Sequence, residues 1–207
     1  MLFRSERVVQ RRGFQFSSDD LRNFHTCMKI GGLTVLAGPS GTGKSTLPQL
    51  YAEALGWTNR YLHVSVRPDW LDDRDFVVAF NPLVRRFEPS NSGVVDHLIA
   101  ASVDGERNLG GVFFVGLDEM NLARVEHYFA QFLSVLELPS GRRFITLFAP
   151  GQADPADPYF PFRELLIGDN VRFVGTVNVD ETTHFFSPKV RSEEHTSDLQ
   201  SQFRISY

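Results

Sequence analysis

The spacing of apolar residues along the chain switches between two periods, and this predicts strands that alternate with helices. Apolar runs predict buried strands at 33–37, 112–117 and 170–181. Alternation of apolar and polar residues predicts a strand at 60–66, and 142–150 is predicted as a strand that forms one arm of a hairpin. Apolar residues at helical spacing predict helices at 17–32, 45–56, 94–105 and 121–137. Such an alternation is typical of an α/β fold built on a parallel sheet.

Residues 67–93 interrupt this alternation. The segment is rich in Pro, Asp, Arg and Asn, with aromatic residues between them, and predicts a long excursion from the core. Long excursions are usually functional, because structureless segments of more than about 15 residues are uncommon in compact domains. A solvated surface excursion explains the same composition, so both interpretations stay open.

Composition narrows the class of protein. The chain has 207 residues, 42% hydrophobic and 22% charged, which suits one globular domain with a proper core. A net charge of −4 gives no basic footprint for nucleic acid. No apolar run approaches the roughly 20 residues of a membrane helix, and the basic N-terminus lacks the apolar stretch of a secretory signal.

Cysteine and histidine exclude two further classes. The single Cys27 excludes an internal disulfide and suits a reducing cytoplasm, where we expect it to be a small buried hydrophobe. The six histidines show no spacing for zinc ligands. We therefore expect a cytoplasmic protein with no membrane partner.

The stretch GPSGTGKST fits the phosphate-binding pattern G-x-x-x-x-G-K-[ST]. Glycines let backbone N–H groups approach the phosphates of a nucleoside triphosphate, Lys44 reaches the terminal phosphates, and the Ser45 hydroxyl is placed to hold Mg²⁺. The strand at 33–37 and the helix at 45–56 supply the required setting, and a chance glycine-rich turn is the alternative. The candidate nucleotide-binding residues are Gly38, Pro39, Ser40, Gly41, Thr42, Gly43, Lys44, Ser45 and Thr46.

A second motif follows the most apolar predicted strand, 112–117, which ends in Asp118 and Glu119. Ligands of open α/β sheets bind at the carboxyl ends of strands. There Asp118 would complete the Mg²⁺ shell with Ser45, and Glu119 would polarise an attacking water. An acidic turn explains the pair alone, but together with the glycine loop it predicts a nucleotide-hydrolysis site.

A third polar position closes the strand predicted at 170–181. A polar side chain at the end of a central strand beside a phosphate loop can orient the attacking water, and we assign this role to Asn178. An ordinary strand-end turn is the alternative. The candidate catalytic residues are thus Glu119 and Asn178, and the candidate metal ligands are Ser45 and Asp118.

With these motifs in place, the chain resembles an AAA+ ATPase module. More narrowly, VRPDWLDDRDF, DEMNLARVEHYFAQFLSVLE and VGTVNVDETTHFFSPKV resemble McrB-type AAA+ NTPases, the motor subunits of modification-dependent restriction systems, and their dynein-related relatives. The resemblance covers residues 17–190. Many NTPases share the phosphate loop and the Asp-Glu pair, whereas the helix after DEMN and the NVDE strand are more specific.

The resemblance implies a P-loop NTPase fold, a three-layer αβα sandwich with a parallel sheet in the order 5-1-4-3-2, and Mg²⁺-dependent hydrolysis in ring hexamers. It makes Gly38–Thr46 the Walker A motif, Asp118 and Glu119 the Walker B motif, and Asn178 sensor 1. In this family an arginine finger follows the segment TTHFFSPKV, and a helical lid with sensor 2 comes later. The finger, the fifth strand and the lid are not recognisable here. An arginine finger raises the rate of hydrolysis roughly 10³–10⁵-fold, so without one we expect little turnover of nucleotide.

The last residues do not fit this pattern. RSEEHTSDLQS, from Arg191 to Ser201, has no helical or strand period and resembles the translation of a common sequencing-library adapter. We expect foreign sequence from Arg191 on, with a genuine polar tail as the alternative. The expected organisation is a lead-in segment with a helix at 1–32, an incomplete AAA+ nucleotide-binding core at 33–190 and a non-native tail at 191–207.

Three functions follow from the motifs and the resemblance. The first is an AAA+ module that binds Mg²⁺ and ATP and, in a homo-oligomeric ring, hydrolyses ATP to drive remodelling or DNA translocation. The second is a GTP-hydrolysing, McrB-like motor subunit with a nuclease partner and DNA. Only the family resemblance favours ATP over GTP, because a phosphate loop contacts the phosphates and does not distinguish the bases. The third is a nucleotide-gated assembly module with little turnover.

Overall fold

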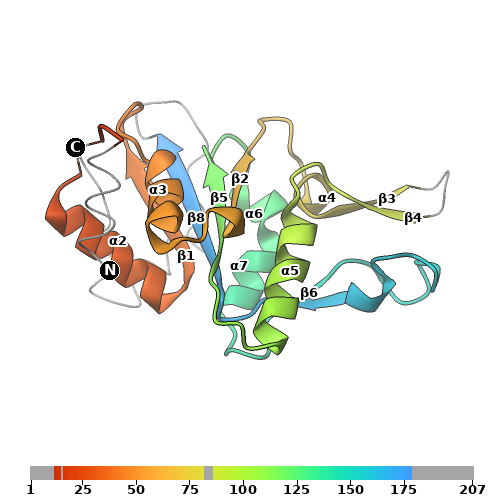
Figure 1. Cartoon of the computed structure of the whole chain (residues 1–207). Helices are drawn as coiled ribbons and strands as arrows, with labels where there is room; N and C mark the ends of the chain where they lie inside the picture. Colours follow the sequence, from red (N-terminus) through yellow and green to blue (C-terminus); the bar gives the residue numbers. More distant parts are fainter. Residues whose placement is uncertain (1–11, 15, 82–85, 179–207) are drawn as a thin grey trace.

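The structure, a computed structural model, describes residues 12–14, 16–81 and 86–178. Its centre is a sheet of four strands in the order β1-β8-β5-β2, in which every neighbouring pair is parallel (Figure 1). These strands are β1 (Gly32–Gly38), β8 (Val171–Asn178), β5 (Phe113–Asp118) and β2 (Tyr61–Ser65). The predicted α/β fold with a parallel sheet is confirmed.

The strand order is informative. Counted along the chain, the four strands stand as 1-4-3-2, which is the expected order without its fifth strand. Among the described residues, no strand pairs with the outer edge of β1. The tail from Arg191 and the last residues of the predicted strand, 179–181, lie outside the described residues.

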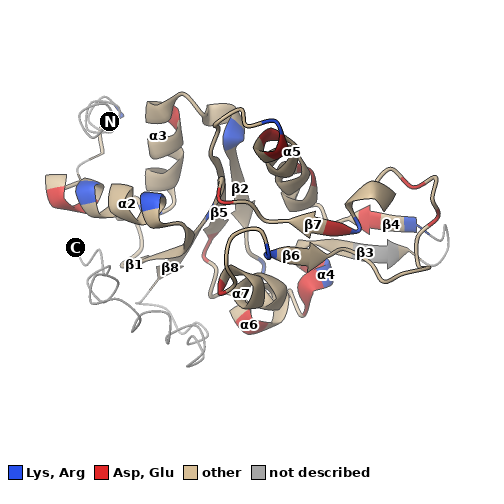
Figure 2. Ribbon diagram, turned by 90° about the horizontal axis from the view of Figure 1, so that it is seen from below, with Lys and Arg blue, Asp and Glu red and all other residues tan. Residues whose placement is uncertain are grey.

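Helices cover both faces of the sheet. Successive strand residues point to opposite faces, and in β5 Phe114 joins one apolar cluster while Val115 and Leu117 join another. Figures 1 and 2 show α3 and α7 on opposite sides of the sheet, so the arrangement has three layers. The Phe114 cluster includes α2 (Ser18–Ile30) and α3 (Thr46–Leu55), and the other includes α5 (Val94–Glu106), α6 (Val125–Tyr128) and α7 (Ala130–Leu136).

Helix α2 lies within the range predicted at 17–32 and is capped at both ends. The Ser17 hydroxyl accepts a hydrogen bond of 3.0 Å from the Asp20 N–H, and the Asp20 carboxylate accepts one of 3.2 Å from the Ser17 N–H. This capping box satisfies two N–H groups that the first helical turn leaves without partners. The helix ends at Gly31, whose φ of 93° favours glycine.

The helix predicted at 121–137 is wrong in its extent. The residues before α6 form turns and bends, and α6 and α7 are separate short helices that meet at Phe129, where φ is −112°. The Tyr128 hydroxyl donates a hydrogen bond of 2.9 Å to the Met120 carbonyl and so stabilises the turn before α6. The apolar period continues across the break, because the side chains on both sides of it are buried, and the sequence therefore suggested one helix.

The excursion at 67–93 carries structure of its own. It begins after a 3₁₀ helix, Thr58–Arg60, and strand β2. It contains a short helix and an antiparallel hairpin: α4 (Asp73–Phe76), β3 (Val78–Asn81) and β4 (Arg86–Pro89). The predicted excursion from the core is therefore built partly of regular structure.

The strand predicted at 142–150 is shorter in the structure, where β6 spans Phe144–Thr146. It pairs antiparallel with β7 (Glu164–Leu166) and so forms one arm of a second hairpin. A 3₁₀ helix, Phe160–Phe162, precedes β7. Figures 1 and 2 show both hairpins projecting from the same end of the molecule. The Phe87 ring stacks on Phe148 with 4.6 Å between centroids, which ties the two hairpin regions together.

Candidate functional site

The glycine loop lies between β1 and α3, in the predicted strand–loop–helix setting. Gly41 and Gly43 have φ values of 79° and 85°, a left-handed conformation that side-chain-bearing residues rarely adopt. The Gly43 carbonyl accepts hydrogen bonds of 3.0 Å from the N–H groups of Thr46 and Leu47, which starts α3 at the loop. The backbone needs glycine at these positions, so the motif pattern has a conformational cause.

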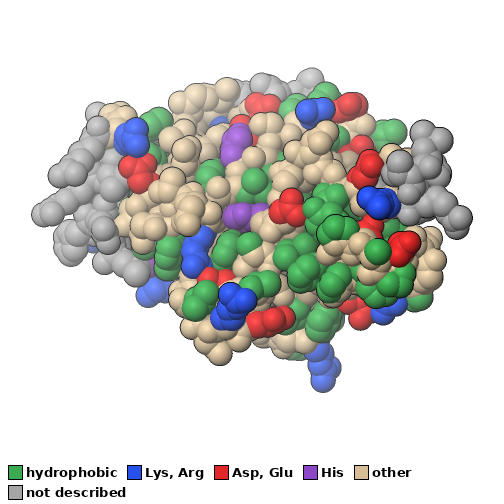
Figure 3. Space-filling view, turned by 45° about the vertical axis from the view of Figure 1, so that its right-hand side comes forward, with side chains coloured by type: hydrophobic (Ala, Val, Ile, Leu, Met, Phe, Trp, Pro, Cys, Tyr) green, Lys and Arg blue, Asp and Glu red, His purple; other side chains and the backbone are tan. Residues whose placement is uncertain are grey.

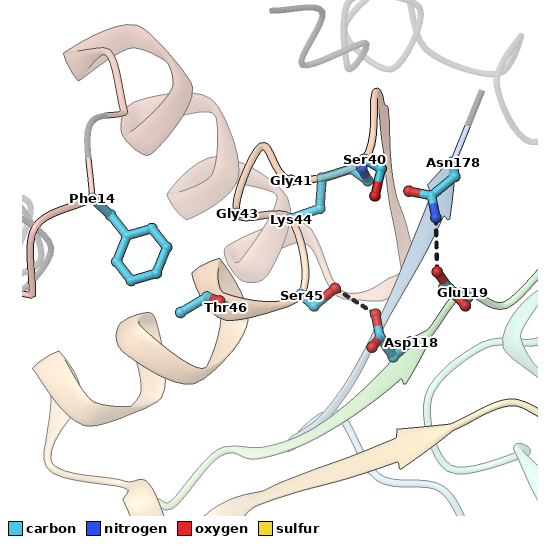
Figure 4. A pocket seen from close by; sticks show the side chains of 10 residues that line it. All are labelled: Phe14, Ser40, Gly41, Gly43, Lys44, Ser45, Thr46, Asp118, Glu119 and Asn178. Atoms are coloured by element: carbon cyan, nitrogen blue, oxygen red, sulfur yellow. Dashed lines mark hydrogen bonds between the residues drawn. The ribbon is translucent and has the colours of Figure 1, made fainter. Parts of the chain in front are cut away.

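A cavity of about 260 Å³ opens over this loop (Figure 4). Six of the nine predicted nucleotide-binding residues line it, and so do Asp118, Glu119 and Asn178 from the ends of β5 and β8. Residues from three distant parts of the sequence thus meet at the carboxyl end of the sheet, where open α/β folds bind ligands. The six loop residues are Ser40, Gly41, Gly43, Lys44, Ser45 and Thr46.

The other three predicted residues, Gly38, Pro39 and Thr42, do not line the cavity. Gly38 is the last residue of β1. Pro39 and Thr42 contact the lysine of the motif instead: Nζ of Lys44 donates a hydrogen bond to the Pro39 carbonyl and lies 3.5 Å from the Thr42 Oγ1. Lys44 is 6% exposed, so the loop encloses its ammonium group.

Ser45 and Asp118, the two predicted metal ligands, are in contact. The Ser45 Oγ donates a hydrogen bond to Oδ1 of Asp118. In the part of the chain that the structure describes, no three His, Cys, Asp or Glu residues gather into a metal-binding group. One carboxylate and one hydroxyl are hard oxygen donors of the kind Mg²⁺ takes when phosphates and waters supply its other ligands. The residues present therefore fit Mg²⁺ held together with a nucleotide.

Glu119 and Asn178 face each other at one end of the cavity (Figure 4). The Asn178 Nδ2 donates a hydrogen bond of 2.8 Å to the Glu119 Oε1. Glu119 has a φ of 51°, which is rare for a residue with a side chain. A strained backbone of this kind often occurs at functional sites, where the surroundings hold it in place.

Sequence reasoning missed two residues near the carboxylates. The Thr176 Oγ1 donates a hydrogen bond of 2.8 Å to Asp118 Oδ1, and the His63 Nε2 lies 3.9 Å from Asp118 Oδ2. A signal for Thr176 existed, because it precedes Asn178 by two positions and therefore lies on the same face of β8. No comparable pattern marks His63.

Phe14 is a third residue that the sequence did not reveal. It lines the cavity, and Figure 4 shows it on the side of the loop away from Glu119 and Asn178. A Cβ added at Gly43 would lie 3.0 Å from the Phe16 ring and 3.2 Å from the Phe14 ring. The two aromatic rings therefore pack directly against the glycine loop, and glycine at position 43 lets them do so.

Tyr61 forms part of the support beneath the site. Burial, and secondly the negative charge of Asp118, raise the pKa of Tyr61 to about 12, so this phenol is neutral at physiological pH. A Cβ added at Gly116 would lie 2.5 Å from the Tyr61 hydroxyl. Gly116 in β5 thus makes room for a neutral side chain just below the carboxylates.

Two other pockets contain no residues of the glycine loop or of the Asp118–Glu119 pair. One of about 400 Å³ lies beyond β2, and its Arg74 is paired with Asp72. The other, of about 480 Å³, lies on the β6–β7 hairpin and is lined mainly by apolar residues such as Phe148 and Phe160. Figure 3 shows hydrophobic side chains gathered on the right-hand part of the face it displays.

A comparison with protein-family models gave no match, and a comparison with curated proteins gave none either. The interpretation of the site therefore rests on its geometry and on the sequence motifs. Within the described ranges, no helix combines the length and the apolar character needed to cross a bilayer.

Proposed function

We propose that the chain is a cytoplasmic nucleoside-triphosphate-binding module of the AAA+ type, which binds ATP with Mg²⁺ and hydrolyses it as part of a ring. One observation carries the proposal. The hydroxyl of Ser45 on the glycine loop contacts Asp118 at the end of β5, and Glu119 stands beside it in the same cavity. A phosphate loop and two carboxylates placed in this way have the parts for nucleotide binding and for activation of a water.

Each side chain has a role in this proposal. Lys44 exchanges the Pro39 carbonyl for phosphate oxygens when a nucleotide enters. Ser45 and Asp118 would hold Mg²⁺, which neutralises phosphate charge when bound. Glu119 polarises the attacking water, and Asn178 orients that water and also holds the Glu119 carboxylate through its amide.

The narrower AAA+ assignment, with its core at 33–190, is supported by two features. The strand order 1-4-3-2 agrees with that of the family once the fifth strand is left out. Segments that begin at or near the ends of β2, β5 and β8 resemble McrB-type proteins in sequence. That resemblance also brings in the alternative of a GTP-hydrolysing motor subunit with a nuclease partner and DNA.

The deciding experiment is a titration of the purified chain with ATP and with GTP, each in the presence of Mg²⁺. Preference for ATP supports the general AAA+ proposal, and preference for GTP supports the McrB-like alternative. Tight binding with negligible turnover, even at high protein concentration, would support the nucleotide-gated assembly module. A folded sample that binds neither nucleotide would contradict the proposed function.

A further inference from the structure

Thr176 in β8 contacts both of the residues that carry the candidate site's carboxylates. Its Oγ1 lies 2.8 Å from Oδ1 of Asp118 and 2.9 Å from the backbone nitrogen of Glu119. An ionised carboxylate only accepts and a backbone N–H only donates, so the hydroxyl donates to Asp118 and accepts from Glu119. Thr176 is 4% exposed, so water competes little for either bond.

Thr176 also lies where the pairing of β5 with β8 ends. The parallel register between β5 and β8 ends at the pair Leu117 and Gly175. Beyond this pair, the Thr176 hydroxyl accepts a hydrogen bond from the Glu119 N–H. The Thr176 carbonyl accepts one of 2.9 Å from the Met120 N–H. One residue of β8 therefore holds the turn in which Glu119 takes its left-handed φ of 51°.

The two bonds act on different parts of the site. The bond to Oδ1 fixes the Asp118 carboxylate, and the same oxygen receives the Ser45 hydroxyl. The bond to the Glu119 N–H fixes the backbone from which the Glu119 carboxylate reaches Asn178. Removal of the hydroxyl would leave Asp118 with one donor fewer and the Glu119 N–H without its partner.

We propose that Thr176 is a positioning residue, whose single hydroxyl sets the metal-binding carboxylate of Asp118 and the water-activating carboxylate of Glu119 at the same time. This inference rests on the proposed function, because the two carboxylates need such placement only if they act on a nucleotide and its ion. The hydroxyl is therefore expected to affect the Mg²⁺ concentration needed for binding and the rate of hydrolysis. It should not affect the affinity of the glycine loop for the nucleotide.

The test compares four proteins: the unaltered chain, Thr176→Val, Thr176→Ser and Thr34→Val. Valine keeps the shape of threonine and removes the hydroxyl, whereas serine keeps the hydroxyl. Thr34 is a matched control, because it is 6% exposed in the neighbouring strand β1 and its hydroxyl contacts Cys27 and not the site. Binding of a fluorescent ATP analogue is titrated at increasing MgCl₂ concentrations, and kcat and KM are measured alongside.

Loss of a hydrogen bond to a charged group changes the equilibrium constant that depends on it about tenfold or more. We expect Thr176→Val to raise the Mg²⁺ concentration for half-maximal binding about tenfold and to lower kcat at least about tenfold. The affinity for the analogue at saturating Mg²⁺ stays within about twofold of the unaltered chain, because the loop is untouched. Thr176→Ser restores most of both losses, and Thr34→Val changes neither.

An unchanged Mg²⁺ requirement in Thr176→Val would overturn the inference while the proposed function stands. So would a Thr176→Ser protein as impaired as Thr176→Val, or a Thr34→Val protein with the same defects, because either result assigns the effect to packing. If the unaltered chain binds no nucleotide at any Mg²⁺ concentration, the proposed function fails and this inference fails with it. Should circular dichroism show that Thr176→Val does not fold, Thr176→Ala in the same titration decides.

Discussion

Asn178 and Glu119, which are 59 residues apart in sequence, are joined by a hydrogen bond of 2.8 Å from amide to carboxylate. Asn178 is also the register partner of Gly38, the first residue of the glycine loop motif. The end of β8 thus lies between the loop on one side and the Asp-Glu pair on the other. The three motifs therefore meet at one site, and variants of single residues can test their roles separately.

The Glu119→Gln variant is expected to bind nucleotide normally and to lose turnover by about 10²–10⁴-fold, because the amide keeps its acceptor for Asn178 but cannot polarise water as a base. Equilibrium binding and steady-state hydrolysis, measured on the same preparation, check this. Glu106→Gln at the end of α5 is the control and should behave like the unaltered chain. Undiminished turnover in Glu119→Gln would remove Glu119 from the catalytic role.

The Lys44→Ala variant is expected to weaken nucleotide binding on the order of 100-fold or more, because it removes the positive charge that the loop holds for the phosphates. A binding titration checks the loss, and circular dichroism checks that the fold persists. Lys29→Ala, at an exposed position in the last turn of α2, is the matched control. Tight binding by a folded Lys44→Ala protein would contradict the assignment of the site.

The central strands β5 and β8 could be predicted because they are buried on both faces and so appear as apolar runs. The edge strand β2 could be predicted because its exposed and buried residues alternate. The glycine loop could be predicted because its backbone needs glycine, as at Gly43. The break at Phe129 could not, because a burial pattern reports which side chains are inside and not whether the backbone turns between them. Likewise Phe14 reaches the cavity through tertiary packing alone, and no local pattern encodes that.

The Gly175→Ala variant is expected to lose about 1–3 kcal/mol of unfolding free energy through overpacking. A Cβ at this position would lie 2.0 Å from Sδ of Met120, which is fully buried, so the Met120 side chain would have to shift within the core. Since Met120 directly follows Glu119, turnover should fall as well. Urea denaturation measures the first effect and steady-state hydrolysis the second.

Gly105→Ala is the natural comparison for that variant. Gly105 lies within α5, where an added Cβ would be 3.6 Å from the nearest atom, an ordinary contact with Asn170. Alanine should therefore stabilise the chain by about 0.5–1 kcal/mol, because it restricts the unfolded backbone. Equal denaturation midpoints for the two alanine variants would show that Met120 yields easily.

His97 predicts a pH dependence of stability. Burial lowers the pKa of His97 below 6.5, and its Nε2 has no hydrogen-bond partner among the described residues. As pH falls below 6.5, the unfolded chain takes up this proton before the folded chain does, so the free energy of unfolding decreases. The loss of unfolding free energy attributable to His97 should reach about 1.4 kcal/mol for each pH unit by which burial lowers its pKa.

The measurement is urea denaturation between pH 7.5 and pH 5.5 for the unaltered chain and for His97→Leu. The leucine variant should lose less stability over this range, whereas His127→Gln, at an exposed position, should lose as much as the unaltered chain. Parallel pH profiles for the unaltered chain and His97→Leu would mean that His97 titrates normally in the folded state.

The pairing of β1 with β8 sets the order in which the chain can build its site. Gly32 pairs with Arg172, so the strand before the loop pairs with a segment 140 residues further along the chain (172 − 32 = 140). Parallel pairing over such a separation is slow, because the chain must close a long loop before the contact stabilises anything. During synthesis, the glycine loop is made early but gains its neighbour only when nearly all of the described chain has left the ribosome. Under the proposed function, nucleotide binding is therefore expected only after β8 has paired with β1, so binding would report that the sheet has formed.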